Sequence, residues 1–243
     1  MPPATEELAQ NPDNFGGFNT HLVSATSNGY ELGVRGDLED QNLYYDLTGF
    51  YLRTEHDFDR YRITDPLRNQ ETFYRNAGSS NRFGLEVYSK YDPISSLQLR
   101  VAYTYSHFKY SNTSPLRIMM DDPTIIKYIV DGNWLPNSPM HQLYLDAQYR
   151  FTSGFFAGVS IESQTKTYID GANVEAEAAA GYTLFHGRVG YKWHLAGIYG
   201  ELTLNVRNIG DKQYVAFTEP DPGGNAYQPG ATREFFGGVK IQM

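Results

Sequence analysis

Charged and aromatic side chains that could bind a small ligand gather in two long stretches between predicted strands. Residues 54–71 contain the candidate contacts His56, Arg60, Tyr61, Arg62 and Arg68. Residues 109–138 add Arg117, Tyr128 and Trp134. Clustered arginines bind carboxylates and catecholates well, because the guanidinium group donates paired hydrogen bonds. We therefore predict that these stretches contact an anionic small molecule, although any single loop charge is more often simply solvated.

Other site chemistry finds no support in the residue types. The chain has no Cys, which excludes disulfides, thiolate metal sites and cysteine nucleophiles. The run of residues 56–59 (HDFD) and the pair Asp121 and Asp122 do not have the spacing of a known metal site. No nucleophile elbow is present. We therefore expect no enzyme activity, no metal centre and no cofactor.

Composition narrows the class of protein. The 20 Lys and Arg residues are outnumbered by 28 Asp and Glu, so the net charge is −8 and a nucleic-acid partner is not expected. Mean hydropathy is −0.51, and no stretch is long and apolar enough to predict a transmembrane helix. The chain nevertheless contains 20 Tyr and 23 Gly, residue types that favour strands and turns respectively. This composition predicts an all-β fold.

The elements that must position the two stretches are long strands with alternating polarity. Leu97, Leu99, Val101 and Tyr103 lie on one face of such a strand, and the intervening polar residues lie on the other. Nine strands are predicted, at residues 29–38, 41–53, 72–91, 96–108, 139–151, 154–165, 181–194, 197–208 and 232–243. Residues 1–28 are expected to form a lead-in segment.

The connections between these strands alternate strictly between short and long. Short turns are predicted near residues 39–40, 92–93, 152–153 and 195–196, and long loops at 54–71, 109–138, 166–180 and 209–231. An antiparallel up-and-down sheet would then have all its turns at one end and all its loops at the other. This layout is typical of a transmembrane β-barrel. A soluble β-sandwich is the alternative, but its strands are usually shorter.

The barrel prediction assigns each side chain to a face. Tyr91, Tyr103, Tyr105, Tyr149, Tyr191 and Trp193 should face lipid, where aromatic residues form girdles. The following charged residues should face the interior: Glu31, Arg35, Asp37, Asp46, Arg82, Glu86, Arg100, Asp146, Arg150, Arg188, Lys192, Glu201 and Arg207. Nine is an odd number of strands, whereas bacterial single-chain barrels have an even number. We therefore expect the chain to be part of a larger barrel.

Five short motifs follow one another along the chain. They are YELGVRG at 30–36, NAG and GLE at 76–78 and 84–86, the Pro139 and His141 pair, LTLNVRNIGDKQY at 202–214, and FGGV at 236–239. In this order they resemble the motifs of one family, the TonB-dependent outer-membrane receptors, and the resemblance extends over essentially the whole chain. It implies that residues 1–243 form the C-terminal portion of a receptor barrel, with about nine of about 22 strands present and the plug domain absent.

The resemblance also implies a function. Such receptors import a scarce ligand, most often a ferric siderophore, across the outer membrane of Gram-negative-type bacteria. The expected partners are outer-membrane lipid, the barrel-assembly machinery, a small iron chelate, and the TonB complex acting through the plug domain missing here. A fragment without its plug should not perform coupled transport alone. A passive porin-like channel and a soluble β-rich binding module remain as alternatives.

Overall fold

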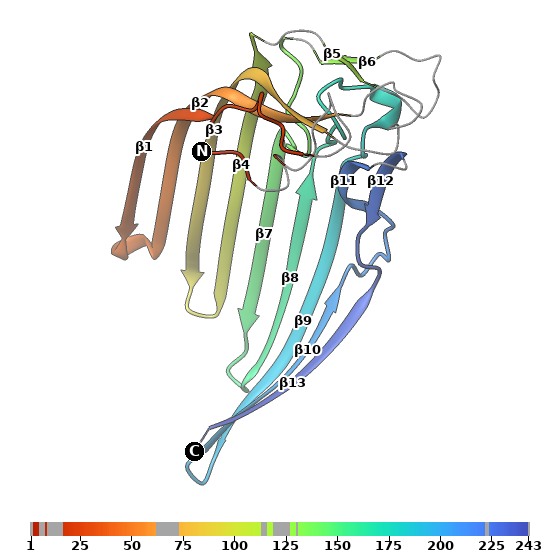
Figure 1. The fold of residues 1–243 in the computed structure, drawn as a ribbon. Helices are drawn as coiled ribbons and strands as arrows, with labels where there is room; N and C mark the ends of the chain where they lie inside the picture. The colour runs from red at the N-terminus through yellow and green to blue at the C-terminus, as the bar shows by residue number, and fades with distance from the viewer. Residues whose placement is uncertain are drawn as a thin grey trace.

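The computed structural model describes residues 2–4, 8, 17–61, 73–112, 116–118, 127–129, 131–221 and 224–242. One long curved sheet dominates it (Figure 1). Its strands are β1 (Thr26–Leu38), β2 (Leu43–Tyr61), β3 (Phe73–Ile94), β4 (Leu97–Ser111), β7 (His141–Arg150), β8 (Phe155–Gln164), β9 (Tyr182–Leu195), β10 (Ile198–Arg207) and β13 (Glu234–Gln242). In the part of the chain that the structure describes, no helix is both long and apolar enough to span a membrane.

The sheet is antiparallel throughout, and its order is β1-β2-β3-β4-β7-β8-β9-β10-β13. Each strand pairs with the preceding strand of the sheet in chain order, as an up-and-down topology requires. Among the described residues, β1 and β13 each pair on one side, so the sheet is open. The nine predicted strands are thus confirmed, together with their antiparallel order.

The pairing register confirms the predicted faces. Residues directly opposite one another in an antiparallel pair point to the same side of the sheet. The register connects Arg35 to Asp46, Arg100 to Asp146, and Lys192 to Glu201. Followed strand by strand, it places all thirteen charged residues predicted to be internal on one side, hereafter the inner face. The six predicted girdle aromatics lie on the other side, hereafter the outer face.

Short turns and long connections lie at opposite ends of the sheet (Figure 1). The β9–β10 turn consists of Ala196 and Gly197, whose φ angles of +51° and +84° suit the type I′ turn that twisted hairpins prefer. The β3–β4 turn is Ser95 and Ser96, three residues later than expected. Asp92 and Pro93 instead lie in the last part of β3, where the register shifts after Tyr91.

Two small hairpins within the long connections were not predicted. They pair β5 (Leu116–Ile118) with β6 (Lys127–Ile129), and β11 (Val215–Asp221) with β12 (Gly224–Pro229). Their strands are too short for alternation to stand out in the sequence. β2 also continues to Tyr61, although a loop was expected from residue 54. Two 3₁₀ turns, at Glu39–Gln41 and Glu175–Glu177, complete the described elements.

The best-buried side chains lie near the long connections. Ala77, Tyr110 and Leu135 form the apolar cluster there. Phe73, Ser80, Asn19 and Thr218 are almost completely buried as well. Elsewhere the sheet is one layer thick, and its outer face leaves large apolar side chains such as Leu32 and Val239 exposed. The loop end of the sheet is therefore the region with a packed interior.

Candidate functional site

A β-bulge at His56 shapes the loop end of β2. Glu55 pairs with Ser79, but the next paired residue, Asp57, is opposite Gly78, so His56 is the extra residue. Its φ of +55° is unusual for a residue with a side chain, and its carbonyl accepts a hydrogen bond of 2.7 Å from Nδ2 of Asn76. Because a bulge shifts the side-chain alternation by one residue, Asp57 points to the inner face.

Asp57 is the centre of a polar cluster on that face. Nη2 of Arg82 lies 2.6 Å from Oδ2 of Asp57, and the hydroxyl of Ser80 donates to the same oxygen. Nη1 of Arg82 also donates to Oγ1 of Thr54 over 2.9 Å. The Asp57 and Arg82 side chains are only 16% and 24% exposed, so their ion pair is partly shielded from water. The cluster connects β2 to β3 where the loops begin.

The β11–β12 hairpin closes over this region through Asn137. The side-chain amide of Asn137 donates to the carbonyl of Thr218 over 2.6 Å, and its oxygen accepts from the Thr218 amide and hydroxyl at 3.2 and 2.8 Å. The Thr218 side chain is completely buried. Three hydrogen bonds therefore join segments 81 residues apart. At the outer end of the hairpin, Nδ2 of Asn225 donates to Glu177 over 2.6 Å.

A cavity of about 470 Å³ lies between the Asp57 cluster and this hairpin, and we call it the mouth cavity. Its size is within the range of small-molecule sites. Aromatic, aliphatic and polar groups all contribute to its lining: Asp57, Phe58, Tyr74, Arg82, Phe108, Tyr110, Leu135, Pro136, Asn137, Ser138, Ile169, Asp170, Phe217, Thr218 and Glu219. Such a lining can stack on ligand rings and hydrogen-bond to ligand oxygens. The mouth cavity is our candidate ligand site.

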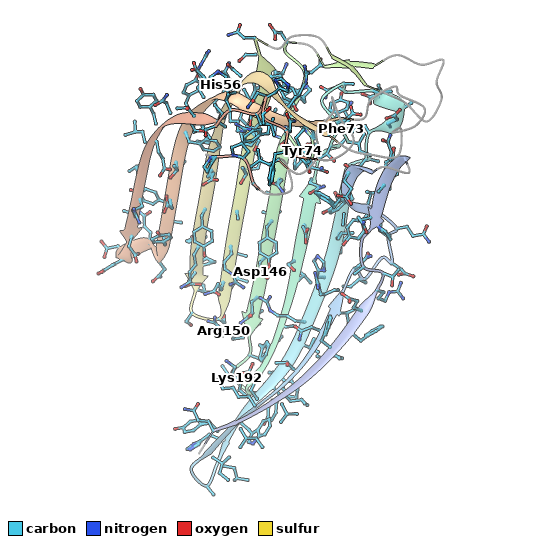
Figure 2. The ribbon with its side chains drawn as sticks, in the orientation of Figure 1. His56, Phe73, Tyr74, Asp146, Arg150 and Lys192 are labelled. Atoms are coloured by element: carbon cyan, nitrogen blue, oxygen red, sulfur yellow. The ribbon has the colours of Figure 1, made fainter. Side chains whose placement is uncertain are left out.

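Below the mouth cavity, charged side chains continue along the inner face. Figure 2 shows His56, Phe73 and Tyr74 near the long connections, and Asp146, Arg150 and Lys192 successively farther along the sheet. Asp146 is fully buried between Arg100 and Arg188, at 2.7 and 2.9 Å. Its negative charge is compensated by these two guanidinium groups, so the burial of this carboxylate is balanced by ion pairing.

The predicted contact residues are distributed unevenly. His56 is exposed beside the mouth cavity but is not part of its lining. Trp134 lies opposite Lys109, which belongs to the outer face, and lines a different cavity. Arg117 and Tyr128 pair across the β5–β6 hairpin, but the positions of their side chains lie outside the description. The same is true of Arg60 and Tyr61 at the end of β2, while Arg62 and Arg68 lie entirely outside the described residues. The role of all eight predicted contact residues in ligand binding stays a prediction.

None of the residues that line the mouth cavity was in the candidate set. Tyr110, Asn137, Ile169 and Thr218 come from four separate segments, and no local motif marks them. They meet because the connections fold over one another. Asp57 and Arg82 did show a signal, since Asp57 is a charged residue in the predicted loop 54–71 and Arg82 is one of the charged residues predicted to face the interior. Within the described ranges, no group of three or more His, Asp and Glu side chains could hold a metal ion.

Comparisons with known proteins agree with this architecture. A family model described as "TonB dependent receptor-like, beta-barrel" matches residues 1–209. The chain is 25% identical over 191 residues to the ferrioxamine B receptor of Salmonella typhimurium (strain SL1344), covering 77% of the chain and 24% of that receptor. It is 27% identical over 226 residues to the ferric-pyoverdine M114 receptor PbuA of Pseudomonas sp. (strain M114), covering 88% and 24%.

Solved structures show the same fold. The unliganded ferric citrate transporter FecA superposes with a TM-score of 0.67 at 20% identity, covering 89% of this chain and 31% of that chain. The chain therefore spans about a quarter of the length of the curated relatives it matches.

Proposed function

The chain belongs to the TonB-dependent receptor-like β-barrel family, and from this we propose that it is the C-terminal part of an outer-membrane receptor barrel that imports a ferric siderophore. The observation that carries the proposal is the open nine-stranded up-and-down sheet with all long connections at one end. Relatives named as receptors for ferrioxamine B and ferric pyoverdine support an iron-loaded siderophore as the ligand.

The mouth cavity supplies the proposed binding surface. Its aromatic side chains offer stacking surfaces, and Asp57 holds Arg82 in a fixed position, from which its remaining N–H groups can reach a ligand oxygen. The eight sequence candidates, from His56 to Trp134, are proposed to add contacts from the surrounding loops. The charged inner face below provides a hydrated route towards the short-turn end.

A complete receptor needs more than this chain. Because the matched region is only 24% of the length of each of these relatives, we propose that the remaining strands and a plug domain come from another part of the receptor. TonB energisation would act through that plug. Outer-membrane lipid would surround the outer face, and the barrel-assembly machinery would insert the strands.

Transport can be measured in cells that lack their own siderophore receptors. Cells carrying the complete reading frame that contains these residues should take up radioactive iron supplied as ferrioxamine B or ferric pyoverdine, and a protonophore should abolish that uptake. Arg82→Gln should weaken binding at the cell surface, whereas Lys90→Gln, an inner-face change near the short-turn end, should not. Absence of binding to either chelate would contradict the proposed ligand class.

The two alternatives give different results. A passive channel would leave uptake insensitive to the protonophore and would conduct ions in planar bilayers. A soluble binding module would stay in the aqueous fraction after cell lysis without detergent. Either result would overturn the receptor proposal.

A further inference from the structure

The outer face of β4 changes in character along its length. From the short-turn end to the loop end, its outer residues are Leu97, Leu99, Val101, Tyr103, Tyr105, His107 and Lys109. Aliphatic side chains are followed by aromatic ones, then by a histidine and a cation. This sequence of side chains is typical of the change from hydrocarbon to headgroups at a membrane interface. The loop end of β4 therefore lies at headgroup depth.

Lys109 is held at that depth by Trp134. The two residues pair across an isolated bridge, and the Lys109 ammonium lies 4.5 Å from the Trp134 ring centroid. The Trp134 ring also contacts His107, with centroids 4.9 Å apart. No carboxylate among the described residues forms an ion pair with Lys109. In a chain with a net charge of −8, this ammonium is thus positioned by a ring, and the part of the chain that the structure describes gives it no carboxylate partner.

A cavity of about 380 Å³ lies against the same Trp134 ring, and we call it the rim cavity. Its lining consists of Trp134, Ser138, Met140, Thr165, Lys166 and Tyr168. Nζ of Lys166 lies 5.0 Å from the Tyr168 ring centroid and pairs with Glu175 at 2.5 Å. The rim cavity thus combines apolar walls with three hydroxyls and one ammonium. Lys109 adds a second ammonium from across Trp134.

We propose that the rim cavity and Lys109 bind the phosphate group of an anionic membrane lipid, whose acyl chains lie on the outer face of β4 and the neighbouring strands. Lysine side chains close to the membrane surface attract anionic lipid headgroups. The apolar walls and the adjoining lipid-facing surface select a lipid over a free phosphate ion, because a free ion would leave both uncovered. The inference rests on the outer-membrane location proposed above, but not on the identity of the transported ligand.

Native mass spectrometry of the product of the complete reading frame that contains these residues, in detergent, can test this. The probes are phosphatidylglycerol and phosphatidylcholine with identical acyl chains. The chain should retain phosphatidylglycerol in preference, and Lys109→Gln should reduce its retention about fivefold. Lys109→Arg should restore it. Arg53→Gln is the matched control, because Arg53 also lies on the outer face but already pairs with Glu55 at 3.4 Å.

Three results would overturn the inference. The first is equal retention of both lipids, and the second is unchanged retention in the Lys109→Gln variant when its circular dichroism matches that of the parent. The third is displacement of the lipid by millimolar inorganic phosphate, which would indicate a free-anion site. A chain found in the aqueous fraction would overturn this inference and the receptor proposal together. A membrane-embedded chain without lipid preference would overturn this inference alone.

Discussion

The carboxylate of Asp146 on β7 forms an ion pair with Arg188 on β9 and accepts a hydrogen bond from it, although β8 lies between these two strands. Nη1 and Nη2 of Arg188 approach the Asp146 oxygens to 2.9 and 3.0 Å. The guanidinium passes over Gly158 of β8, where a Cβ atom would lie 2.8 Å from Nε of Arg188. A residue without a side chain on the middle strand therefore allows an ion pair across three strands.

Asp146→Ala should destabilise the sheet. It would leave Arg100 and Arg188 without the carboxylate that they share, and breaking a buried pair costs 3–5 kcal/mol. The two guanidinium groups are 36% and 22% exposed, so water compensates in part and we expect a loss of about 2 kcal/mol. Urea unfolding in detergent, followed by tryptophan fluorescence, measures it. Glu162→Gln is the control, since Glu162 is 46% exposed and should have little effect.

Gly158→Val should destabilise the chain by displacing the Arg188 side chain. The expected loss is about 1–3 kcal/mol in the parent chain. In an Arg188→Ala background the same substitution should cost less, because the guanidinium is gone and only the Ala147 carbonyl, 3.1 Å from the added Cβ, still crowds it. A double-mutant cycle by urea unfolding gives the coupling. Additive effects of the two changes would contradict the contact.

His56→Gly should stabilise the bulge, because glycine adopts a φ of +55° without the steric penalty of a Cβ atom. We expect a gain of up to about 1 kcal/mol in unfolding free energy. Glu55→Gly, one residue earlier in regular β conformation, should instead be destabilising. Equal effects at the two positions would argue against a bulge centred on His56.

Asn137→Ala should release the β11–β12 hairpin from the loop end. The substitution removes three hydrogen bonds between Asn137 and Thr218 and leaves the buried Thr218 hydroxyl without an acceptor. We expect a loss of about 2–3 kcal/mol in the free energy that holds the hairpin in place. Hydrogen exchange of residues 215–221 should rise well above that of the parent chain. Ser138→Ala is the control, because the Ser138 hydroxyl donates to the nearby carbonyl of Pro136. Unchanged exchange in the Asn137→Ala chain would show that other contacts hold the hairpin.

Acidification should weaken the Lys166 and Glu175 pair. Lys166 lowers the pKa of Glu175, while Glu175 and Tyr168 raise the pKa of Lys166. A carboxyl with a lowered pKa contributes stability above its ordinary pKa of 4.5 and loses it as the pH falls through the lowered value. Hydrogen exchange corrected for its intrinsic pH dependence should thus show less protection around Glu175 at about pH 3 than at about pH 7. In Glu175→Gln this difference should disappear.

The alternation of polar and apolar residues determined the strands and their faces. A strand has a period of two, so the position of Arg100 or Leu99 within its own segment already assigns it to a face. The alternation of short and long connections likewise determined the up-and-down order. These features depend on local sequence alone, which is why they could be predicted.

Only the tertiary structure decided how the loop end is built. The bulge at His56 reverses the face of Asp57, and a one-residue register change leaves no clear mark in an alternating sequence. The contact between Asn137 and Thr218 joins residues 81 positions apart, and the mouth cavity exists because such contacts fold separate loops together. Strand faces follow from local geometry, whereas a cavity between loops follows from long-range packing, so the barrel wall could be predicted and its binding site could not.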